Sequence, residues 1–191
     1  MSSQLSIRNV LIGLGFLLVS SLLLFSIFYL IVTNTGVENV KIPEGAFVAG
    51  IFSTIDYSDS FRIRIPVVES RHPDIVCLTR MFVIALFPGW LDAPIKDEIQ
   101  SIHFQTGESI GHWKVYHKSL NEIVIGFDRS FIDFRVSVLL DEKEGNRWVT
   151  VTTVARYNNW KGWIYFIPVR FGHRIIFADT MRKVKENLKK G

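Results

Sequence analysis

Histidine is the residue type in this sequence that could most readily do chemistry, because its imidazole binds metals and moves protons near neutral pH. His112 and His117 lie five positions apart in an extended stretch, so their side chains point to opposite faces and form a poor ligand pair. No H-x-x-x-H or H-E-x-x-H motif occurs. Cys77 is the only cysteine, which excludes an intrachain disulfide and a thiolate metal cluster. We expect neither a metal site nor another cofactor.

His173 differs from the other histidines because it falls on the apolar stripe of a helix predicted at the C-terminus. The stripe runs through His173, Phe177, Met181, Val184 and Leu188 at steps of three and four residues, and it should face a sheet. One interpretation is a core histidine with one satisfied hydrogen bond. The other is a polar group that lines a cavity, where it orients a ligand or acts as a general base.

No other group of residues forms a recognisable reactive motif. The sequence has no G-x-S-x-G, no P-loop and no G-x-G-x-x-G after a strand, and Ser109 in GESIGH is interpreted as a loop serine. We therefore assign no catalytic residue. Asp133 and Arg135 share one face of a predicted strand and are interpreted as part of a cross-strand ion pair. Arg156 and Arg129 could instead hold an anionic ligand head at a cavity mouth.

The strands that should position these side chains show alternating hydrophobicity. In FRIRIPV, residues 61–67, Phe61, Ile63 and Ile65 face one way and two arginines face the other, which predicts a half-buried strand. Four later runs also read as strands: HWKVYHKS, NEIVIGFD, FIDFRVSVLL and RWVTVTTVARY. Their mixed polar and apolar faces are typical of antiparallel strands that pack one side on a core.

Three helices are predicted around these strands. The first lies in HPDIVCLTRMFVIALFPGW and ends at Pro88-Gly89, and the second covers LDAPIKDEIQSI with Asp92 as its N-cap. The third runs to the C-terminus, begins before Pro168 and kinks there, so that most aromatic side chains near its start are core. These elements predict an α+β domain in which a curved antiparallel sheet surrounds the long C-terminal helix. A cavity is expected between helix and sheet.

Several segments of the chain resemble a known family. DYSDSFRIRIP, DFRVSVLL and VTVTTVARYNNWKGWIYFIPVRFGHRII look like the domain of unknown function family 2867 (DUF2867), over about residues 56–185. The pattern is a Thr-rich strand, a polar turn ending at Gly162, then Tyr165 and a Phe/Pro/His cluster. The family reads Pro-Phe-His where this chain has Phe171-Gly172-His173, with its proline earlier at Pro168. The family is similar to the START-like, helix-grip (SRPBCC) superfamily of lipid carriers and polyketide cyclases. The resemblance implies a fold and no settled activity.

The N-terminal segment is the most apolar part of the chain. Residues 10–32 carry no charge, and a membrane span needs about 20 such residues, whereas the apolar run of a cleaved signal peptide is shorter. We predict a cytoplasmic N-terminus at residues 1–9, a transmembrane signal anchor at 10–32, a linker at 33–46 and a START-like DUF2867-type domain at 47–191. Because basic residues favour the cytoplasmic side, we expect the domain outside the cytoplasm, on an inner or plasma membrane.

The leading functional hypothesis is a single-pass membrane protein whose domain binds an apolar or amphipathic small molecule, such as a lipid. Thr153, Trp163, Tyr165 and His173 are the candidate lining residues, and Arg156 is the candidate partner of a ligand head group. Burying each methylene group contributes about 0.8 kcal/mol, so a dry cavity alone can give affinity.

Two alternative functions stay open. A cyclase-type enzyme would use His173 as its base. An interaction module would dock a partner at the membrane through the basic C-terminal helix, which carries Lys183 and Lys185. Nucleic-acid binding is not expected, because the formal charge is only +4 and no recognition motif occurs. The oligomeric state is left open.

Overall fold

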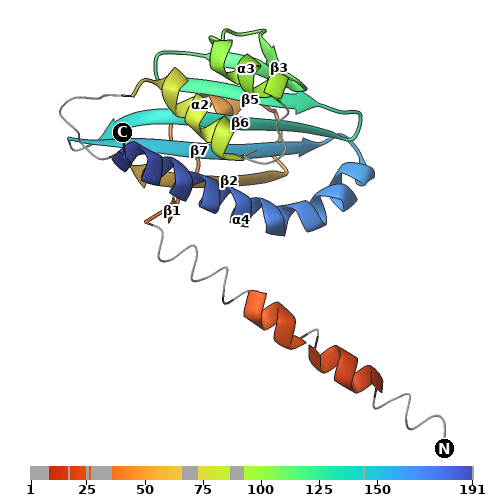
Figure 1. Ribbon diagram of the computed structural model, residues 1–191. Coiled ribbons are helices and arrows are strands. Elements are labelled where there is room, and N and C mark those ends of the chain that lie inside the picture. Colours follow the sequence, from red (N-terminus) through yellow and green to blue (C-terminus); the bar gives the residue numbers. More distant parts are fainter. Residues whose placement is uncertain are drawn as a thin grey trace, which may run out of the picture.

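A computed structural model of the chain describes residues 9–16, 18–24, 26, 36–65, 73–86, 93–143 and 145–190. These residues form an α+β fold around one antiparallel seven-stranded sheet, with the strand order β1-β2-β7-β6-β5-β4-β3 (Figure 1). The α+β class and the antiparallel sheet that the sequence predicts are therefore confirmed.

The elements follow one another along the chain in a simple order. The strands are β1 (Glu38–Asn39), β2 (Tyr57–Arg64), β3 (Ser109–Ile110), β4 (Trp113–Lys118), β5 (Glu122–Asp128), β6 (Ile132–Lys143) and β7 (Asn146–Tyr157). The helices are η1 (Phe47–Gly50, a 3-10 turn), α2 (Ile75–Leu86), α3 (Ala93–Ser101) and α4 (Trp160–Lys190). The predicted N-cap Asp92 and the predicted stop at Pro88-Gly89 lie outside the described residues.

One pairing within the sheet joins strands that are far apart in sequence. β2 lies antiparallel to β7, with Tyr57 opposite Ala155 and Arg64 opposite Trp148. The predicted alternation of FRIRIPV is confirmed, because Phe61 and Ile63 are buried and Arg64 is exposed. Since successive side chains of a strand point to opposite faces, this register decides which residues of β7 meet the helices.

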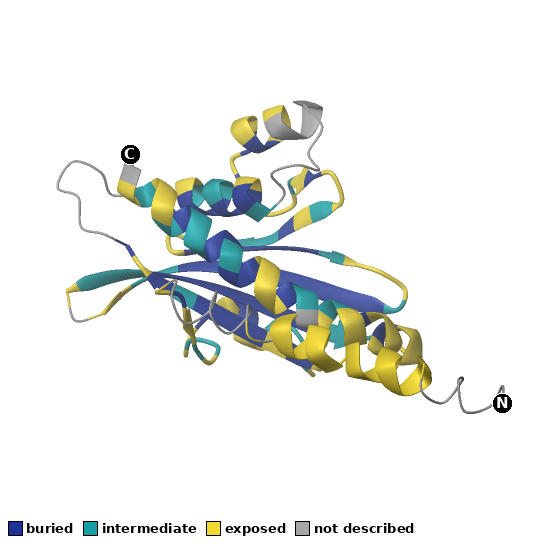
Figure 2. Ribbon diagram, turned by 60° about the horizontal axis from the view of Figure 1, so that its bottom comes forward, coloured by how far each residue is buried: buried dark blue, intermediate teal, exposed yellow. Residues whose placement is uncertain are grey.

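The two faces of the sheet are covered differently. α2 and α4 pack over one face and build the main core with it (Figure 1). On the other face, η1 is held by the buried Glu122 carboxylate, which accepts hydrogen bonds from the backbone N–H groups of Phe47 at 2.7 Å and Val48 at 3.2 Å. Figure 2 shows the long strands between these layers as buried over most of their length. The sheet is therefore a rigid wall behind anything that α4 covers.

Helix α4 begins at Trp160 and contains Pro168, so the prediction that it starts before the proline is confirmed. Its predicted stripe is buried from His173 to Val184, with Leu188 packed against the core. Of the aromatic side chains near its start that were predicted to be core, Phe166 is buried and Trp160 is exposed. Trp163 and Tyr165, which were predicted to line a cavity, are also exposed. A helix can turn only one stripe toward a sheet, and residues 160–169 are apolar on nearly every side.

The transmembrane helix predicted at residues 10–32 is not supported by the described residues. In the part of the chain that the structure describes, no helix is both long enough and apolar enough to cross a membrane. The described helical residues there are 9–16, 18–24 and 26. Residues 17, 25 and 27–32 lie outside the described residues.

The predicted linker at residues 33–46 contributes to the folded domain. Within it, β1 pairs with β2, so that Glu38 lies opposite Arg62. The side chains of Val37 and Ala46 are buried. Residues 36–46 therefore form the edge of the sheet and the approach to η1.

Candidate functional site

An apolar pocket of about 250 Å³ lies between α4, the sheet and the end of α2. Its walls come from all three elements: Tyr165, Phe166, Val169, His173, Ile176 and Phe177 of α4, Trp113, Phe127, Ile132 and Phe134 of the sheet, and Leu86 of α2. None of these lining residues carries a fixed charge. The pocket reaches the surface beside Tyr165 and Ile176, each of which exposes about half of its area.

The sheet side of the pocket is a wall of interlocked rings. Phe127 and Phe134 stack with their ring centroids 5.3 Å apart, and Trp113 meets both edge-on at 5.3 and 5.9 Å. Phe134 and Ile132 lie two positions apart on β6, so their side chains share one face of the sheet. Both line the pocket, so this face is the one that α4 covers. Such packed rings have few alternative rotamers, so this wall is preorganised for an apolar ligand.

His173 lies in the pocket wall, but both of its ring nitrogens face protein groups. Nδ1 is 3.0 Å from Oδ2 of Asp59, and Nε2 is 3.4 Å from Oγ1 of Thr153. Oδ2 of Asp59 also accepts a hydrogen bond from the Tyr57 hydroxyl at 2.6 Å. A neutral ring that donates from Nδ1 and accepts at Nε2 satisfies both contacts. The imidazole therefore presents its ring carbons, more than its nitrogens, to the pocket.

Aromatic rings enclose this buried network. The His173 ring stacks on Phe177 with centroids 3.9 Å apart and meets Tyr57 and Phe134 edge-on at 6.0 and 5.8 Å. Burial, with the adjacent Asp59 carboxylate as a second cause, raises the pKa of the Tyr57 hydroxyl above its ordinary value. Tyr57 therefore stays protonated and keeps donating to Asp59. The other oxygen of Asp59, Oδ1, is buried and has no hydrogen-bond partner among the described residues.

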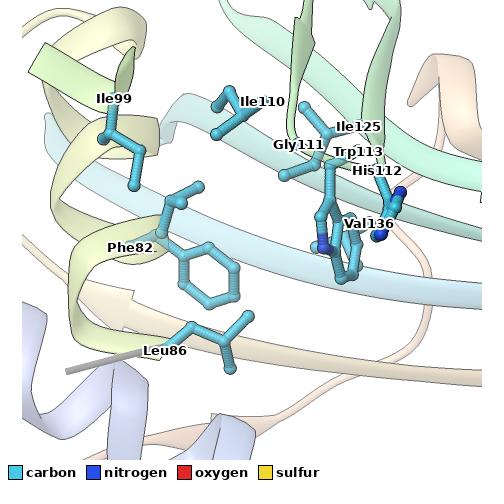
Figure 3. Close-up of a pocket in the computed structure, with 10 residues that line it drawn as sticks. Phe82, Leu86, Ile99, Ile110, Gly111, His112, Trp113, Ile125 and Val136 are labelled. Carbon is cyan, nitrogen blue, oxygen red and sulfur yellow. The ribbon is translucent and has the colours of Figure 1, made fainter. Parts of the chain in front are cut away.

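A second apolar pocket of about 210 Å³ adjoins the first. It lies between α2, α3 and the hairpin of β3 and β4, and its lining residues are Phe82, Val83, Leu86, Ile99, Ile110, Gly111, His112, Trp113, Ile125 and Val136. Figure 3 shows Phe82 and Leu86 of α2 on one side and Trp113 on the other. Leu86 and Trp113 belong to the walls of both pockets, so these two side chains are the partition between them.

The structure brings three of the five predicted ligand-binding residues together. Tyr165 and His173 line the first pocket, and Thr153 lies behind it in contact with His173. Trp163 lies elsewhere on α4, where it lines a smaller pocket next to Arg170. Their role in binding stays a prediction.

Arg156 does not share the pocket. It lies three positions after Thr153 on β7, and an odd separation on a strand places two side chains on opposite faces. There it forms the cross-strand ion pair with Asp133 and lies over the ring of Phe52 at 5.1 Å. Arg135 on the same face pairs instead with Asp128, at 2.7 Å.

Sequence reasoning did not single out Tyr57, Asp59, Trp113 or Leu86. For two of these residues a signal was available, because the alternation of Phe61 and Ile63 extends back to Asp59 and Tyr57 on the same face. The position of Trp113 carries no such signal, since it depends on how the hairpin of β3 and β4 docks on α2.

A family model described as "Protein of unknown function (DUF2867)" matches residues 77–180, more than half of the chain. No curated protein matches the chain.

Two of the solved structures that match the chain are distantly similar to it. One is a protein from Arthrobacter aurescens solved by solution NMR, with 11% identity, a TM-score of 0.42 and coverage of 73% of this chain and 92% of that chain. The other is the crystal structure of CalU16 from Micromonospora echinospora, with 13% identity, a TM-score of 0.25 and coverage of 81% and 92%. Both TM-scores are too low to carry an argument, so the resemblance to the START-like superfamily stays a prediction.

Proposed function

The chain belongs to the DUF2867 family, whose description assigns no activity, and we propose that it binds an apolar small molecule between α4 and the sheet. One observation carries this proposal. The pocket there is walled by aromatic and aliphatic side chains, and both nitrogens of His173 in its wall already face Asp59 and Thr153. A ligand would thus gain affinity from leaving water, with little from new hydrogen bonds.

The dimensions of the cavity favour a ligand that extends through both pockets. Ligand pockets usually measure about 300–1,000 Å³, and the two pockets of about 250 and about 210 Å³ each fall below that range. Together they fall within it. Rotation of Leu86, which lines both pockets, would join them. An elongated aliphatic or lipid-like molecule fits such a two-part apolar cavity better than a compact polar one.

The affinity of such a ligand should depend on its length. Each additional buried methylene contributes about 0.8 kcal/mol, which corresponds to about fourfold in Kd. Association itself costs at least about 4 kcal/mol, so a short molecule confined to one pocket would bind weakly. The affinity should therefore rise along a homologous series until the cavity is full and then stop rising.

Displacement of the fluorescent probe 1-aminoanthracene by n-alkanols of increasing length tests this function. We expect the affinity to increase about fourfold per methylene before it levels off. Val169→Trp should abolish binding, because Val169 lines the first pocket and a larger side chain fills it. The matched control is Ile175→Trp on the exposed side of the same helix. Equal binding by both variants, or an affinity independent of alkanol length, would rule the proposal out.

General-base catalysis by His173 is the second candidate function. The hydrogen bond that Nδ1 of His173 donates to the Asp59 carboxylate favours it, because a carboxylate that holds Nδ1 orients an imidazole for proton transfer at Nε2. Against it, Nε2 faces the buried hydroxyl of Thr153. A base in the pocket would catalyse deuterium exchange next to the carbonyl of a long-chain ketone in D₂O, and His173→Gln would stop that exchange. If the protein only binds, NMR spectra of the ketone show no catalysed exchange.

A further inference from the structure

The first half of α4 is an unusually apolar surface for an exposed helix. Trp160 exposes 68% of its area and Trp163 exposes 58%, and further exposed apolar residues surround them: Ile164, Tyr165, Ile167, Ile175 and Ile176. Large contiguous apolar patches on a protein surface mark sites of interaction. We call residues 160–176 of α4 the docking segment.

The charge of the docking segment is entirely positive. Lys161, Arg170 and Arg174 are exposed, and the sequence has no Asp or Glu from Trp160 through Ala178. From a neighbouring segment, Asp56 faces Arg170 across a small pocket. The surface thus combines tryptophan, tyrosine and isoleucine side chains with three cations.

The second half of α4 has a different character. Lys183 and Arg182 form ion pairs with Asp179 at 2.7 and 2.6 Å, and Lys185 donates a hydrogen bond to the carbonyl of Gly36 at 3.0 Å. These cations are used within the domain. The interaction surface predicted around Lys183 and Lys185 is therefore less suited to a partner than the docking segment.

We propose that the docking segment binds peripherally to an anionic lipid bilayer. Tryptophan and tyrosine prefer the membrane–water interface, where the ring is buried and the polar edge meets the head groups. Isoleucine side chains of an interfacial helix insert below them, and each nearby Lys or Arg gains attraction to acidic lipids. The composition of the docking segment matches all three requirements.

A second copy of the chain is a less suitable occupant. In a symmetric dimer the same patch meets itself, so the cations of one docking segment would face those of the other. The segment has no acidic residue of its own to pair with them. Head groups of acidic lipids supply that missing negative charge.

The position of the pocket adds a consequence that rests on the proposed function. Tyr165 and Ile176 belong both to the docking segment and to the pocket wall. When the docking segment is bound to the bilayer, the pocket would open at the bilayer interface. An apolar ligand could then pass between membrane and pocket without crossing water.

Tryptophan quenching by brominated lipids tests the docking. The full chain is mixed with phosphatidylcholine vesicles, with and without phosphatidylserine, and quenching is compared between the native chain and the Trp160→Phe/Trp163→Phe variant. We expect quenching in phosphatidylserine vesicles that this double variant loses. Because both side chains are exposed, the fold should be retained, and circular dichroism checks it. Because the quenching is measured at Trp160 and Trp163, it distinguishes docking through this segment from membrane contact made elsewhere on the chain.

Charge reversal provides the second arm. Lys161→Glu/Arg170→Glu should weaken binding to phosphatidylserine vesicles by at least about tenfold. Lys189→Glu, an exposed reversal outside the docking segment, should change it little. Quenching that is unaffected by either double variant would overturn the proposal, and so would concentration-dependent self-association through Trp160 and Trp163 without lipid. Ile132→Phe, which fills the same pocket from the sheet side and lies outside the docking segment, should leave docking intact, so failure of ligand binding and failure of docking are distinguishable.

Discussion

At the scale of single residues, the buried pair of Asp59 and His173 is the feature with the largest energetic consequences. Both side chains are almost fully buried; Tyr57 donates a hydrogen bond to Asp59, and Thr153 contacts His173. Breaking such a pair leaves one polar group buried without its partner, which costs far more than the pair contributes. The pair therefore fixes where α4 sits on β2, and with it the shape of the pocket.

A double-mutant cycle measures this coupling. His173→Phe keeps a ring against Phe177 but leaves the Asp59 carboxylate buried with only Tyr57 as donor, so we expect a loss of about 3–5 kcal/mol in the free energy of unfolding. Adding Asp59→Leu should recover part of that loss, because the uncompensated carboxylate is removed. Urea unfolding of the two single variants and the double variant gives the coupling free energy. Strictly additive effects would show that the two side chains do not act as a pair.

At the scale of elements, α4 is positioned by one very close backbone approach at its start. Gly162 is buried, and a Cβ atom there would lie 2.0 Å from the carbonyl oxygen of Phe131, in the turn between β5 and β6. Only glycine allows this approach. At Gly172, later in the same helix, an added Cβ atom would meet no atom within 4 Å other than those of its own helix.

The same substitution at these two glycines should have opposite effects. Gly172→Ala should raise the free energy of unfolding by about 0.5–1 kcal/mol, because alanine favours a helix interior over glycine. Gly162→Ala should lower it by about 1–3 kcal/mol, because the clash with Phe131 moves the start of α4. Thermal unfolding followed by circular dichroism checks both. Stabilisation by both alanines would mean that α4 does not approach the turn as closely as described.

At the scale of the whole molecule, local patterns predicted most elements, and long-range pairing explains what they missed. The alternation of Phe61 and Ile63 and the stripe from His173 to Val184 are local features, and both are confirmed. The pairing of β2 with β7 joins Tyr57 to Ala155, a contact that no local pattern contains. That pairing brings Asp59 to His173, which is why the sequence identified the histidine but not its partner.

Two facts decide which candidate residues reach the pocket. One is whether two residues of a strand are separated by an even or an odd number of positions, and the other is which side of α4 faces the sheet. Thr153 and Arg156 were both proposed as ligand-binding residues, although their odd spacing on a strand separates them. Trp163 was expected in the cavity because the start of α4 is aromatic. The structure instead turns Phe166, Val169 and His173 toward the sheet. Which stripe of a uniformly apolar helix faces inward depends on its docking, since its own sequence offers no contrast.

The most direct test of ligand binding between α4 and the sheet is a methyl NMR titration of the full chain with dodecan-1-ol. We expect chemical-shift changes at methyl groups of Ile132, Val169 and Ile176, which line the first pocket, and at Val136 in the second. Methyl groups of Val48 and Val124, in the cluster on the opposite face of the sheet, should not shift. Saturable shifts confined to the pocket methyls would support the account. Shifts at Val48 and Val124, or none at any site, would contradict it.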